Sequence, residues 1–230
     1  MRRISILAFL LLAVLSGCKE KVEFQEVKTG TYNFYTLWKG DRVHLGDTVT
    51  LGDYRLVLNR LDYYLSGVEL RDKEKSFGFI DALLIHPDSS YTRSYEYENR
   101  PPNGVKMNFG VRMSANTQTT PADYVTEHPL GIKGSNGMYW TWTTGYKFIR
   151  LDAKILDYQT DPFVISWHLG SVQQDFVTTI EHDFQEGIEI EFDAYKLFRS
   201  DVWKNHPSLH TPSQRVDSLL YVCLNEGLSL

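Results

Sequence analysis

Apolar and polar residues alternate along much of this chain, a pattern typical of strands in antiparallel sheets that bury one face. The clearest runs are 105–113, 163–169 and 188–194, and Ile149, Leu151 and Ala153 share one face of another. Earlier strands are predicted at 32–38, 48–51, 54–59 and 66–71, separated by Gly-Asp turns. The pattern therefore predicts an all-β chain.

Three segments depart from the alternation. Residues 86–104 and 114–136 are rich in Pro, Ser, Asn, Thr and Gly, and they are predicted to be long loops. Near the end, Ser213 is placed to cap a helix, apolar residues follow at helical spacing, and Gly227 ends the run. Together these signals predict an antiparallel β-sandwich with long loops and a short C-terminal helix.

The N-terminus carries a secretion signal. Arg2 and Arg3 precede an apolar run, Ile4–Leu15, that is too short to span a membrane. Small residues then lead to Cys18, as in the lipobox of bacterial lipoproteins, where this cysteine is acylated. The alternative is a plain secretory signal with an incidental cysteine. We expect Cys18 to be lipidated.

The predicted division of the chain follows from that site. Residues 1–17 are the lipoprotein signal peptide, 18–30 the lipidated cysteine and a charged tether, and 31–230 one β-sandwich domain. Lys19 follows the cysteine where inner-membrane retention would favour Asp, so the expected location is the outer membrane, on its periplasmic or cell-surface side.

Composition narrows the function classes. The formal net charge is −5, and loss of the two signal arginines makes the mature chain more acidic, so we expect no nucleic-acid partner. With Cys18 committed to lipid, Cys223 has no partner for an intrachain disulfide. No HExxH, GxSxG, P-loop or GxGxxG motif is present, and the chain is predicted not to be an enzyme.

An aromatic segment, Gly137–Phe148, is the most unusual part of the sequence. It holds Tyr139, Trp140, Trp142, Tyr146 and Phe148 within twelve positions. Such a density indicates either an aromatic corner of the core or a binding site, because indole N–H and phenol O–H groups need partners.

Two of the seven histidines are candidate metal ligands. His168 lies on the polar face of a predicted strand, just before Gly170, and His128 lies in a loop before the aromatic segment, where Pro129 stiffens the backbone. Each could instead be a hydrogen-bonding or solvated loop residue. For His206 and His210, Pro207 between them argues against a helix, and a solvated loop is favoured.

The acidic residues of one predicted strand and Cys223 can be explained without a functional role. Glu189, Glu191 and Asp193 share one strand face. Such an arrangement could form a catalytic pair of carboxylates or a calcium site, but it is more often the exposed face of an antiparallel sheet. Cys223 falls on the apolar side of the predicted helix, where a buried small hydrophobe is expected.

An ordered set of motifs resembles the MbnP-like family, the copper-binding, methanobactin-operon-type proteins. The set spans about residues 32–225 and comprises Arg60–Val68, Ile80-Asp81, Phe109–Val111 with Asn116, Glu127–Leu130, Gly137–Phe148, Trp167–Ser171 and the ending from Leu197 to Asn225.

The resemblance implies a secreted β-sandwich that binds copper, often encoded beside a di-haem peroxidase-like (MbnH-type) partner. In some relatives that partner oxidises a Trp to kynurenine, whose amine helps histidines to ligate copper. Carried over by motif, Trp140 or Trp142 is the candidate for oxidation, and His128 and His168 are the candidate ligands.

Two hypotheses follow. The leading one is a lipid-anchored, non-enzymatic protein that stores, acquires or delivers copper. The alternative is a glycan- or protein-binding module that uses exposed Trp and Tyr side chains as a stacking platform.

Overall fold

The computed structural model describes residues 26–73, 75–98, 100–158, 163–183, 185, 187–198 and 201–230. Cys18 and the proposed signal peptide and lipobox lie outside these residues. Within the described part, none of the helices has the length and apolar character needed to cross a bilayer.

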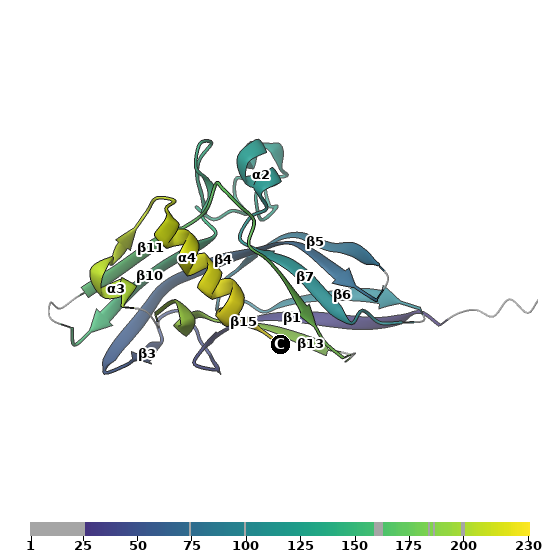
Figure 1. Cartoon of the computed structure of the whole chain (residues 1–230), viewed down its shortest axis with the longest axis horizontal. Helices are drawn as coiled ribbons and strands as arrows, with labels where there is room; N and C mark the ends of the chain where they lie inside the picture. Colours follow the sequence, from purple (N-terminus) through teal and green to yellow (C-terminus); the bar gives the residue numbers. More distant parts are fainter. Residues whose placement is uncertain are drawn as a thin grey trace, which may run out of the picture.

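Two sheets stack into an elongated sandwich, as the alternation predicts (Figure 1). The smaller sheet has the order β15-β13-β1-β2, with β6 also paired to β1. Its strands are β1 (Lys28–Trp38), β2 (Asp41–Arg42), β6 (Tyr91–Tyr97), β13 (Gly187–Asp193) and β15 (Leu228–Ser229).

The larger sheet has the order β12-β7-β4-β10-β11-β14, with β3 and β5 also paired to β4. Its strands are β3 (Thr48–Leu51), β4 (Tyr54–Arg71), β5 (Ser76–Ile85), β7 (Gly104–Phe109), β10 (Ile149–Leu156), β11 (Phe163–Leu169), β12 (Val177–Glu181) and β14 (Ser208–Leu209).

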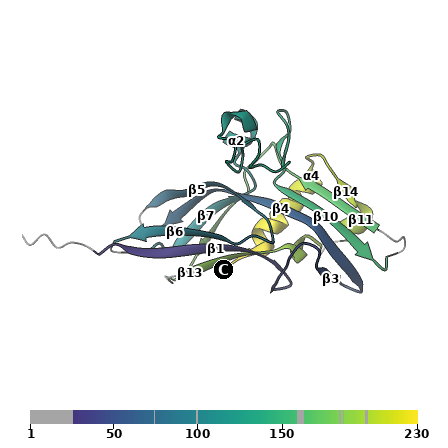
Figure 2. The ribbon, with the colours of Figure 1, turned by 180° about the vertical axis from the view of Figure 1, so that it is seen from behind.

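Strand β4 runs the length of this sheet (Figure 2). Its first half pairs with β3 and β10, and its second half pairs with β5 and β7. The sequence predicted two strands, 54–59 and 66–71, where the structure has one strand of 18 residues. A bulge near Gly67, whose φ is +53°, bends the strand without ending it.

Two further sequence predictions need correction. The proposed loop 86–104 contains β6, whose three tyrosines lie on one face, with Tyr95 buried in the core and Tyr91 and Tyr97 packed against it. The sheets are not wholly antiparallel either, because β1 pairs with β13 and β11 pairs with β14 in parallel.

The predicted C-terminal helix is confirmed. Helix α4 (Gln214–Val222) begins after Ser213, whose Oγ accepts a hydrogen bond from Val216 N, and a π-helical turn, η3 (Cys223–Gly227), follows. Cys223 is fully buried, as expected of a small hydrophobe. The other short helices are α2 (Met113–Gln118), α3 (Val202–Asn205), η1 (Pro121–Asp123) and η2 (Ala194–Phe198).

Residues between β7 and β10 form a module that stands out from one side of the sandwich (Figure 1). It contains α2, η1 and a hairpin made of β8 (Tyr139–Thr141) and β9 (Gly145–Tyr146). The proposed loop 114–136 is thus largely irregular but begins with helical turns. The aromatic segment forms the end of this module.

Gly110 joins the module to the sandwich at a position that only glycine fits. Its φ is +102°, and a Cβ there would lie 2.2 Å from the buried ring of Phe148.

We expect Gly110→Ala to lower the free energy of unfolding by about 3 kcal/mol, measured by denaturant titration. Gly40→Ala is the control, because Gly40 has a φ of +88° in open space and should cost only about 1 kcal/mol. Equal losses would show that the overlap with Phe148 is unimportant.

Candidate functional site

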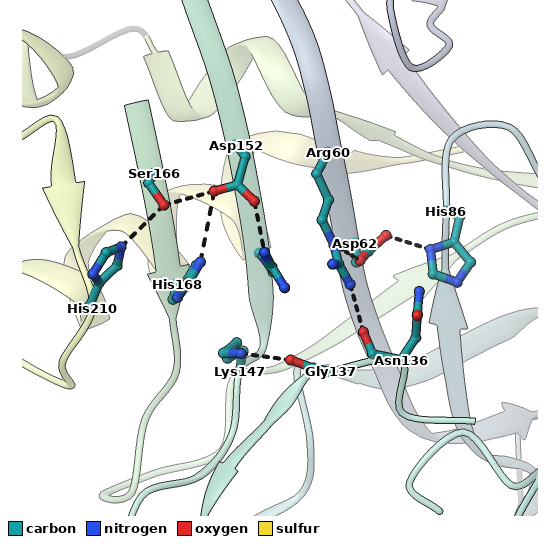
Figure 3. A network of polar contacts seen from close by, with 11 residues as sticks. Arg60, Asp62, His86, Asn136, Gly137, Lys147, Asp152, Ser166, His168 and His210 are labelled. Carbon is teal, nitrogen blue, oxygen red and sulfur yellow. Dashed lines mark hydrogen bonds and ion pairs between the residues drawn. The ribbon is translucent and has the colours of Figure 1, made fainter. Parts of the chain in front are cut away.

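The outer face of the larger sheet carries two rows of polar side chains across its strands (Figure 3). In one row Asp62 of β4 pairs with Arg150 of β10, which pairs with His168 of β11. In the next row the cross-strand partners are Arg60, Asp152 and Ser166. Opposite charges therefore face each other between neighbouring strands.

Strand β14 extends this face by bringing His210 beside His168. It pairs in parallel with β11, with Trp167 opposite Leu209, so the next residues in register are the two histidines. Their rings stack, with centroids 4.4 Å apart and planes inclined by 27°. His210 itself lies just beyond the end of β14 and is exposed, as predicted of a loop residue, but the prediction did not include its contact with His168.

The hydrogen bonds of Ser166 define the protonation of His210. Ser166 Oγ donates its single proton to Asp152 Oδ1 at 2.7 Å and lies 3.1 Å from His210 Nε2. His210 must therefore donate from Nε2, which leaves a lone pair on Nδ1 when the ring is neutral. The pKa of His210 lies below its ordinary value, first because of burial and then because His168 stands beside it. A neutral imidazole is the form that binds metals.

His168 holds a buried nitrogen that has no hydrogen-bond partner in the part of the chain that the structure describes. The side chain is 17% exposed, and its Nε2 lies 3.8 Å from Asp152 Oδ1, which is within range of an ion pair but too long for a hydrogen bond. An unsatisfied polar atom in a buried position costs free energy and calls for an explanation. A ligand that binds this imidazole would supply one.

The surroundings of Asp152 make the metal-free protein sensitive to acid. The pKa of its carboxyl is held below the ordinary value by His168 and also by Ser166 and Arg150, against the opposing effect of burial. A depressed pKa in the folded state adds stability above the unfolded pKa of about 3.9, and this stability is lost as the pH falls through lower values.

We therefore expect metal-free Asp152→Asn to melt below the wild type at pH 7, with the gap closing as the pH falls below about 4. Melting temperatures between pH 3 and 7 measure this. A gap that stays constant over the range would mean that the charge of Asp152 does not stabilise the fold.

Trp140 lies against the end of the same strand. Its ring centroid is 6.3 Å from that of His168. Gly170 allows the hairpin to approach the strand end closely, because a Cβ there would lie 2.7 Å from Tyr146 O. Lys147 Nζ lies 5.9 Å from the indole centroid. The structure thus brings together Trp140, His168 and His210.

Asn116 fixes the hairpin that carries Trp140. Its side chain is buried in helix α2, where Oδ1 accepts from Tyr146 N at 2.6 Å and Nδ2 donates to Ser171 O at 2.7 Å. Lys147 N also donates to Met138 O at 2.7 Å, closing the base of the hairpin. The indole position is therefore set by a buried amide that joins three segments.

The other two sequence-predicted ligands lie apart from this group. The His128 ring stacks on Tyr124, with centroids 4.7 Å apart. Its Nδ1 accepts from Leu130 N at 3.2 Å, and its Nε2 lies 3.5 Å from Asp81. Trp142 follows the end of β8 in a threonine-rich turn and is 78% exposed. The described contacts do not join His128 or Trp142 to His168.

A second carboxylate–histidine contact lies at the opposite end of the polar face. Asp62, only 2% exposed, contacts His86 Nδ1 and Arg60 Nε (Figure 3). In the described part of the chain, no group of three or more His, Cys, Asp and Glu side chains is arranged to hold a metal ion. Among these described residues, the acidic face of β13 therefore has no cluster arranged for calcium. A metal ion at His168 would be held by few ligands.

Sequence reasoning missed His210 because its partner is 42 positions away in a parallel pair, which leaves no local periodicity. Trp167 and Leu209 both pack on the core, and each is followed directly by a histidine. This shared pattern is the signal that could have placed His168 beside His210. Lys147 was also passed over, although a lysine inside an aromatic segment is itself unusual.

Comparisons with known proteins agree with the fold and with the motifs. The family model described as MbnP matches residues 28–213. The solved structure of MbnP from Methylosinus trichosporium is similar, with a TM-score of 0.55, 14% sequence identity and coverage of 76% of this chain and 78% of that one. No curated protein matches the sequence.

Proposed function

Because this chain belongs to the MbnP family, we propose that it binds copper, as Cu(I), through His168 and His210 beside Trp140. The observation that carries the proposal is the buried Nε2 of His168, which has no hydrogen-bond partner among the described residues and whose ring stacks on that of His210. Cu(I) is a soft ion that accepts imidazole ligands, and two histidines on neighbouring strands suit a site with few ligands.

The arrangement also requires a small movement. Stacked rings point their in-plane lone pairs past one another, so binding of one ion by both imidazoles would turn one ring away from the stack. His210 is the ring that can move, because it lies beyond the end of the two-residue strand β14. Its Nδ1 lone pair is available without breaking the bond to Ser166.

Trp140 is our candidate for oxidation to kynurenine, in preference to Trp142. The indole of Trp140 faces His168, so an aromatic amine formed there would add a nitrogen beside the imidazoles. Trp142 is 78% exposed, and none of the described contacts joins it to the imidazoles. The mass of the tryptic peptide that contains both residues, from protein made in its native host, tests this step.

We propose a non-enzymatic role in copper storage, acquisition or delivery, on a lipid anchor at Cys18 in the outer membrane. A di-haem peroxidase-like protein is the proposed partner for the oxidation of Trp140. The family supports a copper-related role, and the anchor rests on the sequence of residues 1–18. Metabolic labelling with a fatty acid, lost in Cys18→Ser, tests the anchor.

The first experiment is an anaerobic Cu(I) titration of residues 19–230, which include every described residue, against a competing chelator. We expect one bound copper per chain and a loss of affinity of about 10-fold or more in His210→Ala. His44→Ala is the control, because His44 is exposed and its ion-pair contact is with Asp88, which is not a proposed ligand. Absence of copper binding by protein from the native host would refute the proposal.

The exposure of Trp142 favours a second candidate function, a glycan- or protein-binding module. An indole that is 78% exposed in a projecting turn can stack on a flat ligand surface. Metal-independent binding to a glycan array that is lost in Trp142→Ala, with Trp140→Ala unaffected, would support this role in place of the copper site.

A further inference from the structure

Lys147 is a buried cation without a carboxylate partner. The residue is only 7% exposed, and its Nζ donates to Gly137 O at 2.6 Å. In the described part of the chain no Asp or Glu oxygen lies within ion-pair distance of this nitrogen, and the Trp140 ring is its other close contact. Burial of an ammonium group is costly unless an opposite charge or several acceptors replace its water.

Two of the charged groups near Lys147 are also cations. The pKa of Lys147 is lowered first by burial and then by Arg150 and Arg60, and Asp152 opposes this effect. All three cations surround the turn Asn136–Gly137, where Arg60 Nη2 donates to Asn136 O at 2.6 Å. Arg150 Nη1 would lie 3.8 Å from a Cβ on Gly137. Figure 3 shows Arg60 and Lys147 reaching the carbonyls of this turn.

The carboxylates of this face do not balance these charges. Asp62 is shared between Arg60 and His86, and Asp152 is shared among Arg150, Ser166 and His168. Three cations therefore meet two carboxylates, each of which has other partners. A copper ion at His168 would add one more positive charge close to Lys147 and Trp140.

From this imbalance we propose that the edge formed by Lys147, Arg150 and Arg60 is an anion site, which binds a carboxylate next to the copper position. A carboxylate suits the donors, because a guanidinium fork and an ammonium group both recognise it. The inference deepens the proposed function by naming the form in which copper is held, as an ion accompanied by a carboxylate. Only its copper half rests on that function.

The test starts with metal-free protein, so that it does not depend on copper. Sodium acetate replaces a bulky sulfonate buffer anion at constant ionic strength, and the melting temperature is measured. We expect a saturable rise of about 3 °C at ten times the dissociation constant. Lys147→Met should abolish the rise. Lys133→Met should retain it, because Lys133 is an exposed lysine that pairs with Glu127.

Arg150→Gln serves as a second variant if Lys147→Met fails to fold, because it leaves the bond from Lys147 to Gly137 intact. It should weaken acetate binding at least fivefold. An acetate-independent melting temperature in the wild type, or a rise that survives in Lys147→Met, would overturn the proposal and leave the cations as supports of the turn.

Copper competition then separates this inference from the proposed function. In the wild type, acetate should tighten Cu(I) binding about 10-fold, and this gain should vanish in Lys147→Met. Acetate binding without copper binding would refute the copper function and keep the anion site. Copper binding without any acetate effect on the metal-free protein would refute the anion site and keep the copper function.

Two Cu(I) donors distinguish a free carboxylate from one that arrives with the metal. Bicinchoninate carries carboxylates and neocuproine carries none. If the anion arrives with copper, transfer from bicinchoninate should slow at least fivefold in Lys147→Met, with transfer from neocuproine unchanged. If the carboxylate is free, both donors should respond to acetate alike. Transfer rates unaffected by both Lys147→Met and acetate would contradict the copper half of the proposal.

Discussion

Replacement of His168 by alanine is expected to weaken Cu(I) binding by about 100-fold or more. His168 stands between Trp140 and His210, so its loss removes the central ligand of the proposed site and the stacking partner of His210. The fold should be retained, because Nε2 makes no hydrogen bond within the described residues and only its longer contact with Asp152 is lost. Competition with a Cu(I) chelator measures the affinity, and circular dichroism checks the fold.

His128→Ala is the matched control for this result. His128 was an equal candidate from the sequence, but its ring packs on Tyr124 and contacts Asp81 away from the polar face. We expect its Cu(I) affinity to stay within about threefold of the wild type. A large loss in His128→Ala with little effect in His168→Ala would place the copper ligands in the projecting module and contradict our assignment.

Asn116→Leu is expected to lower the free energy of unfolding by about 4 kcal/mol. The amide is 2% exposed, and its loss would leave Tyr146 N–H and Ser171 C=O buried without partners. Leucine has a similar volume, so the loss should come from the polar groups more than from a cavity. Denaturant titration measures the effect.

Thr117→Val provides the control for Asn116. Thr117 is the next residue in helix α2, and its exposed Oγ1 donates to Met113 O. A loss below about 1 kcal/mol is expected there. If Asn116→Leu were as mild as this control, the hairpin would be held by its other contacts, and the position of Trp140 would not depend on the amide.

Much of the fold could be predicted from the sequence, because half-buried strands show an alternation of apolar and polar residues over consecutive positions. Residues 188–194 alternate in burial as their sequence does, and Ser213 caps its helix. The family resemblance, read from ordered motifs such as Gly137–Phe148, is confirmed by the family model. These features depend on neighbours in the chain, which a single sequence displays.

The sequence predictions were wrong where the structure of a segment depends on a partner that is distant in the chain. Residues 61–65 of β4 are buried on both faces, so they show no alternation, although the strand continues through them. Strand β6 was hidden among loop-forming residues and exists because it pairs with β1. His210 owes its place to a parallel pair with β11, which no periodicity reveals. The location of the protein and the lipid on Cys18 stay predictions.

The short strand β14 also sets the order in which the site can be assembled. His168 and Trp140 belong to the middle of the chain, whereas His210 is delivered by a segment near its end. A polypeptide exported from its N-terminus gains the second imidazole only when nearly all of it has emerged. Under the proposed export and copper binding, the nascent protein would pass through translocation without its complete copper site, and metal loading would be confined to the compartment where folding finishes.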